Sequence, residues 1–165
     1  MSALAGAFRR GYERGSVAER AGFGVLCSFA STISISRSIN YVLERRRPFP
    51  IARSLWRRVY NAPRRGGQRV HHFVPGIAIA LAAGGAAVLT RTNGCELRFA
   101  LPFGAGTGLT LDELALLIDL DNPYWRTEDV ALAQAAAALI GAGALATRFI
   151  VRGARDPSAA PPRGA

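Results

Sequence analysis

Two adjacent carboxylates, Asp112 and Glu113, lie in an otherwise uncharged and apolar stretch of the chain, residues 99–118. About 20 apolar residues are enough for a helix to cross a bilayer. Ionisable side chains inside such a helix are costly, and they normally face neighbouring helices or a water-filled cavity, where they can pair, bind a metal or carry protons. The stretch therefore predicts a membrane helix that carries a polar site.

Other polar residues should reach the same depth as these acids. At about 1.5 Å per residue, Arg37 lies about 9 Å inside the end of the first apolar segment, and Asp112 lies at about the same depth in the third. Gln134 is at a comparable level near the start of the fourth segment, and His71 and His72 open the second. We therefore predict a polar layer on one side of the membrane, formed by Arg37, Asp112, Glu113 and Gln134.

Three explanations of this layer compete at the level of the sequence. In the first, which the sequence favours, the layer is structural or binds a partner, and Arg37 forms an ion pair with one of the acids. In the second, histidine and carboxylate side chains hold zinc, iron or manganese. The residues available as metal ligands are His71, His72, Asp112, Glu113 and Asp119. In the third, the same residues form a path for protons or a small solute.

Helical geometry turns the two acids toward different neighbours. At about 100° per residue, one stripe of the third segment contains Gly104, Gly108, Asp112, Ala115 and Asp119. The two glycines form a small-xxx-small pair, which permits the close approach of another helix. Asp112 should therefore point into a helix contact, whereas Glu113 is rotated about a quarter turn away and needs a different partner.

Four apolar segments must position these residues. They predict an all-α integral membrane bundle of four transmembrane helices, at residues 21–43, 73–90, 99–118 and 130–151. A basic leader, residues 1–20, comes before them, and a disordered tail, residues 152–165, follows. The basic connector, residues 44–72, has the periodicity of a short interfacial helix around residues 51–59. A cleaved signal peptide is an alternative interpretation of the first segment.

The charge composition favours a lipid partner. The net charge is +10, and every basic residue other than histidine is an arginine. Basic residues that flank long apolar runs are typical of contact with anionic headgroups and argue against nucleic acid as the partner. The pattern predicts a multi-pass protein of the cell membrane with both termini on one side, and the arginine density of the connector places the histidine side in the cytoplasm.

Two blocks of the sequence carry a resemblance to a known group of proteins. VHHFVPG at residues 70–76 and GTGLTLDELALLIDLDNPYW at residues 106–125 resemble small bacterial integral membrane proteins of unknown function. The resemblance implies no reaction. It points to His71, His72, Gly76, Asp112, Glu113, Tyr124 and Trp125 as the positions of interest. A more distant alternative is a metal-dependent intramembrane hydrolase, although two histidines are few for such an enzyme.

Overall fold

The computed structural model describes residues 2–45, 72–90, 96–113 and 128–155. They form the helices α1 (Ala3–Glu13), α2 (Val17–Arg45), α4 (Phe73–Thr90), α5 (Glu96–Asp112) and α7 (Glu128–Ala154). No strand occurs within these ranges, which confirms the predicted all-α class. The predicted interfacial helix at residues 51–59 lies outside the described residues, as do His71, Asp119, Tyr124 and Trp125.

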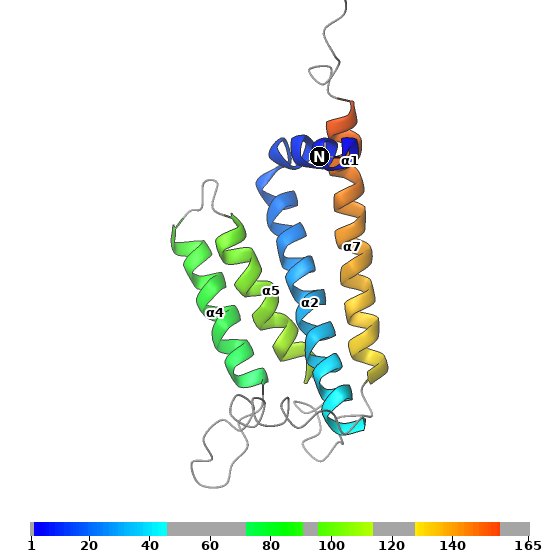
Figure 1. Ribbon diagram of the computed structural model, residues 1–165. Helices are drawn as coiled ribbons and strands as arrows, with labels where there is room; N and C mark the ends of the chain where they lie inside the picture. The colour runs from blue at the N-terminus through cyan, green and yellow to red at the C-terminus, as the bar shows by residue number, and fades with distance from the viewer. Residues whose placement is uncertain (1, 46–71, 91–95, 114–127, 156–165) are drawn as a thin grey trace, which may run out of the picture.

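The four long helices lie side by side in the order α4, α5, α2, α7 (Figure 1). Along this row, α2 and α5 run in one direction and α4 and α7 run in the other. The main contacts of α5 are with α4 on one side and α2 on the other, and α2 packs in turn against α7. The arrangement is therefore an open row of helices, whereas the sequence predicted a bundle.

Glycines on both sides of α5 allow its neighbours to approach closely. A Cβ atom at Gly104 would collide with the backbone of Val25 on α2, and Gly108 faces the same helix. On the other side, a Cβ atom at Gly106 would lie 2.5 Å from the amide nitrogen of Ala80 on α4. Helices in membranes pack through small residues in this way, because lipid provides no hydrophobic force between them. The predicted glycine pair thus marks the contact between α5 and α2.

A capping box formed by Ser16 and Glu19 starts α2. The Ser16 hydroxyl accepts a hydrogen bond from the Glu19 amide at 3.1 Å, and the Glu19 carboxylate accepts one from the Ser16 amide at 2.9 Å. This exchange satisfies two N–H groups that the first turn of a helix leaves without partners. As a result α2 begins at Val17, inside the region predicted to be a leader.

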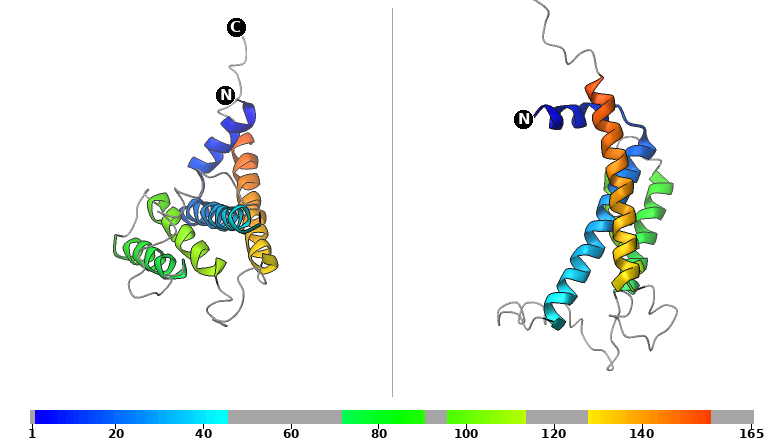
Figure 2. Two further views of the ribbon diagram at one scale, coloured as in Figure 1. Left: turned by 60° about the horizontal axis from the view of Figure 1, so that its bottom comes forward. Right: turned by 90° about the vertical axis from the view of Figure 1, so that its right-hand side faces the viewer.

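The predicted leader also contains α1, which lies across the end of α7 (Figure 2). A Cβ atom at Gly11 would overlap the backbone of Phe149, and one at Gly153 would overlap the backbone of Ala7. Glycines on the two facing helices therefore bring α1 and α7 into direct backbone contact. The leader is thus a packed part of the fold.

The bounds of the other helices agree with the sequence prediction to different degrees. α4 has the bounds predicted for the second apolar segment. α5 begins at Glu96, before the predicted third segment, and ends within it at Asp112. α7 continues to Ala154, so residues 152–154 of the predicted disordered tail are helical. The early start of α5 and the late end of α7 each include a charged residue with an ion-pair partner, Glu96 with Arg20 and Arg152 with Glu19.

Two of the described helices, α4 and residues 129–154 of α7, are long and apolar enough to cross a membrane. In the most apolar 18-residue stretch of each helix, only 11% is buried in α4 and 22% in α7. A core helix of a soluble domain would be mostly buried. Large side chains such as Leu89, which is 84% exposed, and Ile140, which is 74% exposed, face outward. Within the described residues, α2 and α5 do not meet the same criterion of length and composition.

Candidate functional site

Arg37 and Asp112 form an ion pair where α2 packs against the end of α5. The Arg37 Nε atom donates to Asp112 Oδ1 at 2.5 Å, and Nη2 donates to the Asp112 carbonyl oxygen at 2.6 Å. The second carboxylate oxygen accepts a hydrogen bond from the Ser36 hydroxyl at 2.6 Å. The Asp112 side chain is fully buried. Both of its carboxylate oxygens are therefore bonded within the protein, and Arg37 supplies a positive charge beside them.

Glu113 turns toward α4. Its Oε2 atom accepts a hydrogen bond from the amide of Phe73, the first residue of α4, at 3.0 Å. Its Oε1 atom lies 3.4 Å from the Nδ1 atom of His72. The Glu113 side chain is buried and His72 is partly exposed. Glu113 therefore joins the end of α5 to the start of α4. A carboxylate is favourable at this place because the N-terminus of a helix attracts negative charge.

The other predicted site residues are not joined to these contacts within the described part of the chain. Gln134 has a buried Oε1 atom without a hydrogen-bond partner there. Of the predicted metal ligands, His72 and Glu113 lie together, Asp112 pairs with an arginine, and His71 and Asp119 lie outside the described residues. The described residues contain no group of three or more histidine, cysteine or acidic side chains that could hold a metal.

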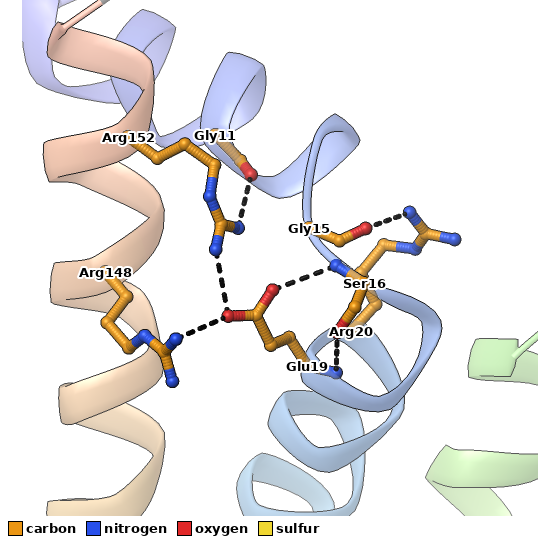
Figure 3. A network of polar contacts seen from close by, with 7 residues as sticks. All are labelled: Gly11, Gly15, Ser16, Glu19, Arg20, Arg148 and Arg152. Atoms are coloured by element: carbon orange, nitrogen blue, oxygen red, sulfur yellow. Dashed lines mark hydrogen bonds and ion pairs between the residues drawn. The ribbon is translucent and has the colours of Figure 1, made fainter.

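A second set of ion pairs lies at the opposite end of the row, where α1, α2 and α7 meet (Figure 3). The Glu19 Oε1 atom accepts a hydrogen bond from Arg152 Nη2 at 2.9 Å and lies 3.2 Å from Arg148 Nη2. The other oxygen of Glu19 is held by the amide of Ser16. Arg152 also reaches the carbonyl of Gly11 on α1, at 3.5 Å. We call Glu19, Arg148 and Arg152 the Glu19 cluster, since this carboxylate links α2 to α7 and, through Arg152, to α1.

Arg20 joins the same end of α2 to α5. Its Nη2 atom donates to Glu96 Oε1 at 2.6 Å, and its Nη1 atom donates to the Gly15 carbonyl at 2.8 Å. The hydrogen bond from Arg20 lowers the pKa of the nearly buried Glu96 carboxyl below its usual value. The contact between α2 and α5 is therefore closed by an ion pair at each end, Arg20 with Glu96 and Arg37 with Asp112.

The environment of Glu19 stabilises its charged form. Hydrogen bonds, first from Arg152 and then from the Ser16 amide, lower its pKa from 4.5 to about 2. Because the pKa is lower in the folded chain than in the unfolded chain, the cluster stabilises the fold above about pH 4.5, and this contribution is lost as the pH falls toward 2.

The ion pairs at the α1 end are not among the site residues that the sequence predicts. A local signal exists for Glu19, because the Ser-x-x-Glu spacing of residues 16–19 marks the start of a helix. No comparable signal connects Glu19 with Arg152, which lies 133 residues further along the chain. The predicted one-sided layer is therefore incomplete, since both ends of the row carry paired charges.

No protein family model, curated protein or solved structure matches this chain. The resemblance to small bacterial membrane proteins stays a prediction. The arrangement of the chain's own residues is therefore the basis for the functional conclusion.

Proposed function

We propose that this chain is a multi-pass protein of the cell membrane with a structural, partner-binding role, and that its four long helices cross the bilayer. The observation that carries the proposal is the exposed apolar surface of α4 and α7, which leaves most of each helix outside the core. In water, apolar surface on this scale would mark an interaction site or cause aggregation. In a bilayer it is the surface that contacts lipid.

The ion pairs support a structural role for the polar residues. Asp112 is buried, and both of its carboxylate oxygens accept hydrogen bonds from Arg37 or Ser36. A carboxylate that moves protons or activates a substrate must be reached by them, and this one is enclosed. Buried ion pairs add little net stability, but removing one partner is costly, so such pairs can specify which helices meet and in what register.

The open row supports a partner-binding role. In a closed bundle each helix turns one face into a shared core, whereas the main contacts of α4 and of α7 are each with one other of the long helices that the structure describes. Their outward surfaces carry the large exposed side chains Leu81, Val88 and Leu89 on α4 and Leu139, Ile140 and Val151 on α7. These surfaces can take up lipid or the helix of another membrane protein.

Membrane crossing is tested by fractionation and by labelling in intact cells. We expect the chain to stay with the membrane in alkaline carbonate and to need detergent for release. In a background that lacks Cys27 and Cys95, Asp129→Cys and Arg155→Cys place single thiols at the two ends of α7. A membrane-impermeant maleimide should label one thiol and not the other. Release by carbonate, or labelling of both thiols from outside, would contradict the proposal.

A metal-binding role is the second candidate, and the His72–Glu113 contact favours it. Two ligands about 2.1 Å from a tetrahedral metal lie about 3.4 Å apart, and His72 Nδ1 is 3.4 Å from Glu113 Oε1. Zinc, iron or manganese would suit these ligand types. His71 and Asp119, which complete the predicted ligand set with Asp112, lie outside the described residues. A bound metal here would be needed for the hydrolase alternative.

Elemental analysis of the purified protein tests the metal-binding role. A metal content near one per chain that falls in His72→Ala and Glu113→Gln, but not in the exposed control Asp129→Asn, would support it. The same background content in the wild type and in all three variants would remove this candidate.

A further inference from the structure

An apolar hollow of about 250 Å³ lies between α1, α2 and α5. Its lining includes Phe8 and Tyr12 of α1, Phe23 and Cys27 of α2, and Leu97 and Leu101 of α5, and it offers no polar surface. A water molecule needs two to four polar partners, and an apolar cavity of about 150 Å³ is already large enough for benzene. The hollow is therefore suited to hydrocarbon.

The hollow is open to the surroundings on the side of α5. Leu97 is 37% exposed and Leu101 is 45% exposed, so the α5 side of the lining meets the surroundings. On the α1 side the hollow is closed by an aromatic cluster, in which Phe8 and Tyr12 contact Phe23 and Phe149. A chain-like molecule can therefore enter the hollow beside α5.

Charged residues lie close to the lining of the hollow in the chain. The ion pair of Arg20 with Glu96 borders it, because Arg20 lies one turn before Phe23 and Glu96 directly precedes Leu97. These two charges neutralise each other. Arg98 is exposed, and in the described part of the chain its side chain has no hydrogen-bond or ion-pair partner.

Arg98 lies next to the exposed lining residues on the surface of α5. At about 100° per residue it is about 60° from Leu101 and about 100° from Leu97 around the helix. It also stands in the first turn of α5, at the end of the row where α1 crosses. The Glu19 cluster, with two arginines around one carboxylate, adds positive charge at the same end.

We infer that the hollow holds one acyl chain of an anionic phospholipid, with the phosphate of its headgroup at Arg98. The inference rests on the proposed membrane location, which would put this end of the row at the level of the headgroups. Hydrocarbon gains little by leaving other lipid tails for an apolar protein surface. The preference for this lipid therefore comes from its charge, and a zwitterionic phospholipid of the same tails binds less well.

Protection of Cys27 tests the inference, because this thiol lines the hollow. In a Cys95→Ser background, N-ethylmaleimide modifies Cys27 in detergent-purified protein, with Cys27→Ala as the blank. Dioleoylphosphatidylglycerol and dioleoylphosphatidylcholine are added in equal amounts to separate samples. We expect the anionic lipid to slow modification about fivefold more than the zwitterionic one. One arginine near an anionic headgroup increases the affinity by about this factor.

Two arginine variants complete the test. Arg98→Gln should abolish the difference between the lipids, and Arg155→Gln, which removes an exposed arginine at the end of α7, should keep it. Equal slowing by both lipids, slowing by neither, or an unchanged preference in Arg98→Gln would overturn the inference. The membrane fractionation tests the proposed function separately. If the chain is soluble without detergent, both the proposed function and this inference are overturned.

Discussion

Paired charges join the helices at both ends of the row, but the Glu19 cluster at one end is more exposed than the Arg37–Asp112 pair at the other. Asp112 and Arg37 form an ion pair whose side chains are 0% and 11% exposed. In the Glu19 cluster one carboxylate is shared by Arg148 and Arg152, whose side chains are 65% and 32% exposed. Solvent and salt screen exposed charges and have little access to buried ones. Salt should therefore weaken the Glu19 cluster more than it weakens the Arg37–Asp112 pair.

The largest effect is expected from Asp112→Asn. The substitution keeps the shape of the side chain but removes one charge of a buried ion pair, which should lower the free energy of unfolding by about 3–5 kcal/mol. Unfolding of the purified protein in detergent measures the loss. Asp129→Asn, at an exposed position in the first turn of α7, is the matched control and should change little.

A double variant sharpens the same test. Replacing a buried ion pair by apolar residues is often neutral, so Arg37→Leu combined with Asp112→Leu should recover most of the stability lost in Asp112→Asn. A double variant as unstable as the single one would show that the charges themselves are required.

A smaller effect is expected from Gly153→Ala at the other end of the row. Its Cβ atom would overlap the backbone of Ala7, so α1 must move away from α7, at a cost of about 1–3 kcal/mol. Gly143→Ala is the control, because a Cβ atom there meets nothing within 4 Å. The effects of Gly153→Ala and Asp112→Asn should add, because the two sites share no partners. Clear non-additivity would mean that the two ends are coupled.

The Glu19 cluster should also respond to acid. Since the pKa of Glu19 is lowered to about 2, its contribution is complete above about pH 4.5 and disappears as the pH falls toward 2. Other carboxylates titrate in the same range, so the measured quantity is the difference in unfolding temperature between wild type and Glu19→Gln. This difference should shrink between pH 5 and pH 2.5, and a constant difference would contradict the assigned pKa.

The smallest effect is expected from Arg148→Gln. Arg148 is 65% exposed, and Arg152 keeps its hydrogen bond to Glu19 when Arg148 is replaced. The unfolding temperature should change by no more than about 2 °C, and the change should vanish in about 1 M salt. A larger fall that persists in salt would place Arg148 in the same class as Arg37.

Much of the helical content could be predicted from the sequence. Of the two sets of ion pairs, the set around Asp112 could be predicted and the set at the α1 end could not. The apolar run of residues 73–90 sets the bounds of α4, because composition alone distinguishes it from its flanks. The spacing of Gly104, Gly108 and Asp112 indicates a contact face, which the structure places against α2. The helical start at Val17 was predictable only from the capping box, and α1 is short and carries arginines, so its pattern resembles a solvated leader.

The sequence by itself determined where apolar helices form and that Asp112 and Glu113 face different neighbours, because composition and the helical repeat are local properties. Only the tertiary structure decided that the acid paired with Arg37 is Asp112, 75 residues away, that Arg152 meets Glu19 across 133 residues, and that the helices lie in a row. These outcomes depend on which glycine faces allow two backbones to touch. That choice is made between helices far apart in the chain, and no single segment encodes it.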